Sequence, residues 1–157
     1  VLKPENLPEK FDRFTGGQGF GLNIAACKVG WKDGKVYVIQ DSGGFNITTR
    51  TFVEDQTAKG WYGTVFPTYC DPAGGERIQE ITNGVKANNS VDPGIDYLSA
   101  LMERGRFFVS SECKGVLGEI WDYTRDENNS VVKVNDHYMD AMRYAVFSEA
   151  TNSVVMS

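Results

Sequence analysis

The sequence predicts a single α/β domain with helices on both faces of a mixed central sheet. Two apolar, β-branched runs flank an Asp-Gly pair at 33–34, which predicts a β-hairpin over residues 20–40. Downstream, strand-like and helical segments alternate along the chain, which is typical of a sheet covered by helices. The 157 residues, 41% of them hydrophobic, supply enough apolar material for one compact core.

Residues 1–13 carry two prolines and alternating charges, and we expect them to be a linker or tail. The domain is expected to span residues 14–150, with a glycine-rich loop at 16–21, and residues 151–157 to form a C-terminal tail. After the hairpin the pattern predicts, in order, a helix at 50–59, a strand at 64–70 containing Pro67, a short helix at 76–83, a strand step at 85–87, a helix at 95–104, a strand at 106–110, a helix at 116–121, a polar loop at 126–130 and a helix at 136–149.

Acidic residues outnumber Lys and Arg by 21 to 16, which gives a formal net charge of −5. A protein with this balance has no strong overall field to attract nucleic acid or anionic lipid, so a polyanion must be held by a local patch or by metal ions. The three cysteines form no CxxC pair and the chain has one histidine, so we expect reduced thiols, a cytoplasmic setting and no zinc site. No apolar run approaches the length of a membrane span. Because the sequence begins at Val1 without an initiator Met, we expect a processed product or a fragment of a longer protein.

The helix predicted at 136–149 is apolar almost all round its axis, which indicates a helix sandwiched inside the protein. Asp140 lies in the middle of it, and a carboxylate in such a place costs several kcal/mol unless it is paired, protonated or bound to a cation. His137, three residues earlier, lies on the same helical face. Two interpretations stay open: His137 and Asp140 form one side of a metal site, or Asp140 pairs with Arg143 and His137 merely begins the helix.

Asp71 also has two interpretations. It follows the strand predicted at 64–70, and ligands of open α/β sheets gather at the carboxyl ends of strands. It also directly precedes Pro72 and a short helix. An Asp at such a position commonly caps the helix N-terminus and takes no part in catalysis. By itself, Asp71 favours the structural interpretation.

The combined pattern resembles the nuclease domain of the large terminases of tailed bacteriophages. The segment KVNDHYMDAMRYA at 133–145 is similar to the family ending K-x-x-D-H-x-x-D-A-x-R-Y-A, and the Asp-Pro-Ala turn at 71–73 matches in the same order. The opening strands at 19–41 and the blocks at 93–95, 105–109, Cys113 and 119–123 follow the family order too. The resemblance covers nearly everything from residue 14 to 147, and it treats Glu119 and Tyr123 as structural positions.

The resemblance implies a ribonuclease H-like fold and metal-dependent cleavage of double-stranded viral DNA. In such domains, acidic residues from the first strand, a central strand and the final helix converge on two divalent ions that bracket the scissile phosphate. Carried over to this chain, Asp71 and Asp140 are two of the acids and His137 lines the same pocket. Hard oxygen ligands favour Mg²⁺ or Mn²⁺. The implied partners are the terminase ATPase domain, the small terminase subunit and the portal protein, in the host cell cytoplasm and away from membranes.

One position departs from the family pattern. The first strand of the family carries an Asp in a D-x-G pattern, and here the best alignment puts Gly19 in its place, with Gly17 as the alternative. Asp41, at the end of the second strand, is a weak substitute. The loss of one acid is expected to weaken metal binding, through a substitution made for study or through natural degeneration.

Three basic residues are candidates for DNA contact: Lys133, which matches a family lysine, and Arg104 and Arg106, for which exposed charge is the simpler interpretation. Two alternatives to a terminase nuclease stay open. One is a nuclease similar to Holliday-junction resolvases, and the other is a catalytically dead domain that binds DNA or docks on the portal. The acidic composition further predicts weak binding of DNA by the isolated domain.

Overall fold

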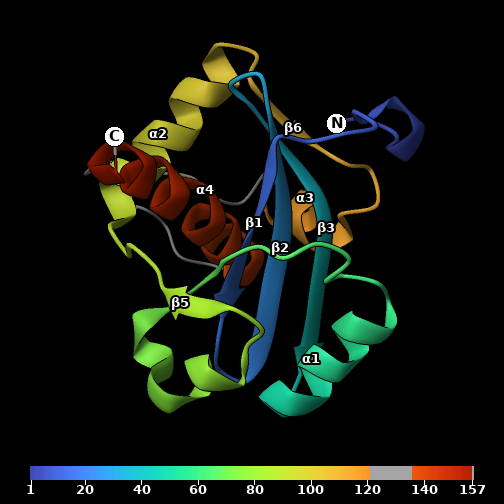
Figure 1. Cartoon of the computed structure of the whole chain (residues 1–157), viewed down its shortest axis with the longest axis vertical. Helices are drawn as coiled ribbons and strands as arrows, with labels where there is room; N and C mark the ends of the chain where they lie inside the picture. Colours follow the sequence, from blue (N-terminus) through green and yellow to red (C-terminus); the bar gives the residue numbers. More distant parts are fainter. Residues whose placement is uncertain (121–135, 157) are drawn as a thin grey trace.

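The computed structural model describes residues 1–120 and 136–156 and contains one six-stranded mixed sheet (Figure 1). The strand order is β5-β4-β1-β2-β3-β6. Strands β1, β2 and β3 form an antiparallel meander, whereas β4, β5 and β6 each run parallel to an inner neighbour. The elements are η1 (Pro4–Asn6), β1 (Arg13–Gly19), β2 (Asn23–Lys32), β3 (Lys35–Phe45), α1 (Thr49–Ala58), β4 (Thr68–Cys70), η2 (Pro72–Glu80), β5 (Gly84–Lys86), α2 (Val91–Glu103), β6 (Phe107–Val109), α3 (Lys114–Ile120) and α4 (His137–Met156).

The predicted hairpin is confirmed as β2 and β3. Its turn places Asp33 at φ 51° and Gly34 at φ 75°, the two positive φ angles that a tight hairpin turn requires. The register runs from Lys32 opposite Lys35 to Asn23 opposite Phe45, with one irregularity between Lys28 and Val29. Asn23 therefore lies at the end of the sheet opposite to the turn.

The glycine-rich loop predicted at 16–21 is wrong over most of its length, because residues 13–19 form the buried strand β1. This strand lies between β4 and β2, near the centre of the sheet. Its residues have low intrinsic preference for a strand, and tertiary packing overrides that preference. The missing side chain of Gly17 lets helix α4 approach the strand closely, since an added Cβ would overlap the carbonyl oxygen of Ala141.

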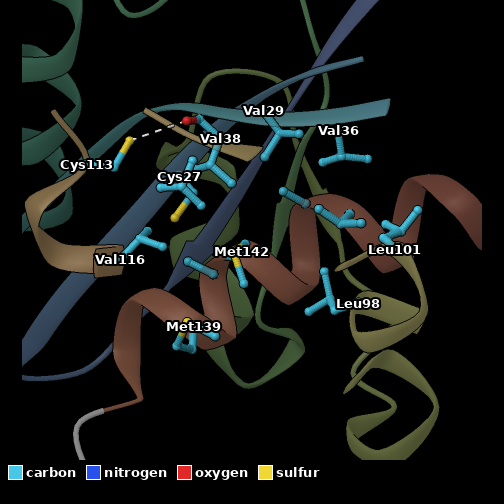
Figure 2. Packing of buried hydrophobic residues seen from close by; sticks show 14 of the residues in the cluster. Cys27, Val29, Val36, Val38, Leu98, Leu101, Cys113, Val116, Met139 and Met142 are labelled. Atoms are coloured by element: carbon cyan, nitrogen blue, oxygen red, sulfur yellow. Dashed lines mark hydrogen bonds between the residues drawn. The ribbon is translucent and has the colours of Figure 1, made fainter. Parts of the chain in front are cut away.

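Helices cover both faces of the sheet, as the sequence predicts. Helix α4 crosses one face, where it packs against β1 and β2, and helices α2 and α3 flank it there (Figure 1). Figure 2 shows the core of this face, in which Cys27 and Val29 of β2 meet Met139 and Met142 of α4. On the other face, Phe52 of α1 packs with the loop side chains Trp61 and Phe66 in a smaller cluster.

Several element boundaries differ from the prediction for local reasons. Strand β4 begins only after Pro67, which has no N–H to donate to a ladder. The short helix after it is of the 3₁₀ type, with Gly75 in a non-helical conformation inside it. Helix α2 starts four residues before the predicted helix at 95–104, and the polar loop predicted at 126–130 lies outside the described residues.

Neither expected tail is a simple tail. At the N-terminus, the Leu2 N–H donates to Val109 O at 2.9 Å and Leu2 O accepts from the Ser111 N–H at 2.7 Å, so this segment pairs with the outer side of β6. At the other end, α4 continues through residues 151–156. The three cysteines are free and buried, as expected. In the described parts of the chain, no helix combines the length and the hydrophobicity needed to cross a membrane.

Candidate functional site

Asp71 lies directly after β4 and beside the end of β1. The two strands are parallel, with Gln18 opposite Cys70, and the Asp71 N–H donates to Gln18 O at 2.9 Å. The next residue along β1 is Gly19, which therefore neighbours Asp71 at the carboxyl ends of both strands. The Asp71 carboxylate also accepts from the Ala73 N–H at 3.0 Å, so it is the N-cap of η2. The structural interpretation of Asp71 is thus confirmed, and its position at a strand end is the one that ligand-binding loops use.

The structure distinguishes Gly19 from Gly17, the two positions at which the first strand could align with the Asp of the family pattern. A Cβ added to Gly17 would overlap Ala141 O and come within 2.9 Å of Ala145 N, so no larger residue fits there. A Cβ added to Gly19 would have Ala25 O, at 3.9 Å, as its nearest neighbour. Both glycines point to the α4 face, because residues two apart on a strand share a face. Gly19 is therefore the position with room for a carboxylate.

Asp140 pairs with Arg143, as one of the two sequence interpretations predicts. The Arg143 Nη2 lies 3.3 Å from Asp140 Oδ1, and the guanidinium is fully buried while the carboxylate side chain keeps 20% of its exposure. Arg143 also donates to Ser90 O at 3.2 Å and to Asn89 Oδ1 at 3.3 Å. A buried guanidinium with three acceptors holds the Asp140 carboxylate in a fixed orientation.

The buried phenol of Tyr144 links Asp140 to Asp71. Burial raises the pKa of Tyr144, and the negative charges of Asp140 and Asp71 raise this pKa further. Both carboxylates therefore act electrostatically on one side chain, although they come from different elements.

His137 begins α4 and points toward the start of β2. Its Nε2 lies 3.5 Å from Asn23 Nδ2. The two residues line a cavity of about 340 Å³ together with Glu119 and Tyr138. Two glycines make room for the Tyr138 ring, since a Cβ at Gly43 or at Gly115 would collide with it.

Glu119 is the site residue that the sequence analysis treats only as structural. The residue is 9% exposed, and its Oε1 accepts from the Tyr138 N–H at 2.8 Å and the Met139 N–H at 3.0 Å. Burial raises the pKa of Glu119 to about 7, and the nearby charges of Asp136 and Asp140 add to this effect, which the two backbone N–H groups partly oppose. A local sequence signal for this role does not exist, because α3 and the start of α4 meet only in the folded chain.

Asp41 does not join the two other aspartates in the described structure. It lies on β3, two strands away from β1, and its Oδ2 accepts from the Val116 N–H at 2.9 Å in the first turn of α3. Burial raises the pKa of Asp41, while the backbone N–H groups of Val116 and Gly115 lower it. Asp41 therefore stabilises the start of α3.

Arg104 and Arg106 do not border the candidate site. Arg106 O accepts from the Val36 N–H at 2.9 Å near the hairpin turn, while the site lies at the opposite end of β3. About seven residues of strand, or roughly 20 Å, separate the two ends. Both arginines are exposed. Lys133 and Tyr123 lie outside the described residues.

Within residues 1–120 and 136–156, no three His, Cys, Asp or Glu side chains are grouped closely enough to hold a metal ion. Gly19 carries no carboxylate, whereas Asp71 and Asp140 carry oxygen donors and His137 carries an imidazole. Carboxylate oxygens are the ligands that Mg²⁺ and Mn²⁺ prefer in proteins.

The fold is shared with known proteins, and part of the sequence matches a known family. Residues 75–149 match the family model described as the terminase RNaseH-like domain. The large subunit of the terminase of Salmonella phage P22 is 48% identical over 56 residues, which make up 36% of this chain and 11% of that protein. The matched segment thus spans about a tenth of the curated relative.

Two solved structures show the same fold. The nuclease domain of the P22 large terminase superimposes with a TM-score of 0.77 at 24% identity, covering 96% of this chain and 87% of that one. The nuclease domain of the large terminase of bacteriophage SPP1, solved with bound Mn, gives a TM-score of 0.69 at 13% identity, covering 89% and 88%. The fold is ribonuclease H-like. Over the matched residues, the sequence is similar to the terminase RNaseH-like family and to the large subunit of the P22 terminase.

Proposed function

We propose that this domain is a metal-dependent endonuclease that cuts concatemeric double-stranded viral DNA during packaging, and that Gly19 leaves it inactive or impaired. The observation that carries the proposal is the position of Asp71 at the end of β4, directly beside Gly19 of β1, where an added Cβ has no neighbour closer than 3.9 Å. The Mn-bound SPP1 domain supports a divalent ion as the cofactor. The proposed partners are viral DNA, the ATPase domain, the small terminase subunit and the portal, in the host cell cytoplasm.

Asp71 and Asp140 would hold the ions, with His137 lining the same region. Mg²⁺ or Mn²⁺ held by these residues in a two-ion site would supply an activated water and stabilise the leaving oxygen of the phosphodiester. The chain's own contribution is to fix the ligands in advance. The Ala73 N–H orients Asp71, and Arg143 orients Asp140, so neither carboxylate needs to reorganise when an ion arrives.

The experiment is to restore the acid with Gly19→Asp and to measure Mn²⁺ binding by calorimetry and nicking of supercoiled plasmid. We expect Gly19→Asp to raise both affinity and cleavage by at least about tenfold, an effect of the size seen for tuned metal sites. Gly19→Ala is the matched control, because it fills the same space without a carboxylate. Asp71→Asn and Asp140→Asn, each in the Gly19→Asp protein, are expected to abolish the gain. If Gly19→Asp neither binds Mn²⁺ more tightly nor cleaves more DNA, the proposal is wrong.

A second candidate function is a non-cleaving domain that docks on DNA or on the portal. Gly19 is the observation that favours it, since the unaltered chain lacks one of the three expected acids. Such a domain has no need of a divalent ion. Absence of Mn²⁺ binding in both the unaltered chain and Gly19→Asp, together with unchanged DNA binding, would support this second candidate.

A further inference from the structure

The first turn of α4 is held by a carboxylate from another helix. The opening N–H groups of an α-helix have no partner within the helix and need acceptors from elsewhere. Here Glu119, one residue before the end of α3, offers its Oε1 to the N–H groups of Tyr138 and Met139, at 2.8 Å and 3.0 Å. Glu119 as a whole residue is 9% exposed, and its hydrogen bond from Met139 is buried while that from Tyr138 is partly buried.

The two N–H groups lie between the candidate ligands. Tyr138 and Met139 separate His137 from Asp140 along the same turn of helix. Glu119 also lines the cavity that contains His137. A displacement of this turn therefore moves the imidazole and the Asp140 carboxylate together.

We propose that Glu119 is a positioning residue for the metal site, because it fixes the first turn of α4 and thereby the places of His137 and Asp140. This inference rests on the proposed nuclease function. Glu119 acts through the backbone of the helix and contacts neither ligand side chain in the described hydrogen-bond network. Negative charge at a helix N-terminus and hydrogen bonds to a carboxylate are both favourable, so Glu119 stabilises the first turn of α4 in two ways.

The far part of α4 has an anchor of its own, which provides a matched control. Glu149 accepts from Arg13 Nε at 3.0 Å and from the Tyr69 hydroxyl at 2.7 Å, and its side chain is 15% exposed. Glu119 and Glu149 thus both fasten α4 through a mostly buried carboxylate. They differ in that Glu119 holds the turn that carries the ligands, whereas Glu149 lies three turns away.

The test introduces Glu119→Ala, Glu119→Gln and Glu149→Ala separately into the full-length Gly19→Asp protein and compares each with that parent protein by Mn²⁺ titration. Loss of a residue that orients metal ligands typically costs 10- to 100-fold in affinity, and we expect at least about tenfold for Glu119→Ala. Glu119→Gln keeps an oxygen acceptor and is expected to stay within about threefold of the parent protein. Glu149→Ala is expected to lower the melting temperature and to leave Mn²⁺ affinity unchanged. An equal loss of affinity in both alanine variants, or none in Glu119→Ala, would overturn the proposal.

A readout without metal separates this inference from the proposed function. Amide exchange of Tyr138 and Met139 is expected to speed up in Glu119→Ala, to recover in Glu119→Gln and to stay unchanged in Glu149→Ala. His137 is the single histidine of the chain, so its imidazole NMR signals report the same turn without overlap. Normal exchange and an unmoved histidine signal in Glu119→Ala would refute the positioning role. Lack of Mn²⁺ binding by every variant would instead refute the proposed function.

Discussion

Replacing each of two glycines on one face of β1 by alanine is predicted to change the free energy of unfolding in opposite directions. Gly17 and Gly19 lie two residues apart, and both face α4. At Gly17 an added methyl group overlaps the carbonyl oxygen of Ala141 and lies within 2.9 Å of Ala145 N, which are both backbone atoms of a buried helix. At Gly19 the nearest atom to an added methyl group is 3.9 Å away.

The magnitudes follow from these contacts. Gly17→Ala forces α4 away from the sheet, and we expect it to lower the free energy of unfolding by about 3 kcal/mol or more, at the upper end for overpacked cores. Gly19→Ala adds no collision and restricts the unfolded chain, so it is expected to raise that free energy by about 0.4 to 1 kcal/mol. The difference between the two variants is a large fraction of the free energy of unfolding of a typical domain, which is about 5 to 15 kcal/mol.

Urea unfolding followed by tryptophan fluorescence and by circular dichroism measures both variants against the unaltered chain. Coincident transitions from the two probes confirm two-state behaviour before the midpoints are compared. Equal effects of the two substitutions would refute the reasoning, and so would a larger loss at Gly19. Either result would mean that α4 does not approach β1 at Gly17 as the structure describes.

Three further predictions follow from buried groups. Arg143→Met is expected to cost about 3 kcal/mol of unfolding free energy, measured in urea, because Asp140 and two other acceptors lose one buried donor; a cost below about 1 kcal/mol would contradict it. The folded-state pKa of Glu119, about 7, lies above its unfolded value of 4.5, so the native state binds the extra proton and stability falls as pH rises from 4.5 to 7. Glu119→Gln does not titrate, and it is expected to gain stability relative to the unaltered chain between about pH 5 and pH 8; a constant difference would refute the shift. Gly43→Ala is expected to cost about 2 kcal/mol by displacing the Tyr138 ring, and the cost should largely vanish in a Tyr138→Ala background, with additivity as the contrary outcome.

The parts of the fold that the sequence predicts well depend on short-range signals. The hairpin turn needs two positive φ angles, and Asp33-Gly34 is a residue pair that adopts them. Side chains along a helix point to all sides of its axis. Apolar residues on nearly every side of α4 therefore indicate directly that the helix is buried. The end of α1 near Gly60, at φ 76°, is likewise a local property of glycine.

The parts that the sequence does not predict depend on contacts between distant segments. Strand β1 has glycines where a strand pattern needs side chains, and the approach of α4 explains the one at Gly17. The location of Arg106 shows the same limit, because the end of the sheet at which a residue lies follows from strand order and direction. Glu119 is the clearest case, since its partners lie 19 and 20 residues further along the chain.

The two edges of the sheet bear on how the domain behaves at high concentration. The edge strands β5 and β6 are three residues long, and Leu2 already uses backbone groups of Val109 and Ser111 along the outer side of β6. Exposed, unpaired strand edges are templates on which other chains add by β-pairing. Short edges, one of them already engaged by the N-terminal segment, offer such chains little to pair with. The same backbone bonds that dock the N-terminal residues therefore also protect the domain against edge-to-edge aggregation.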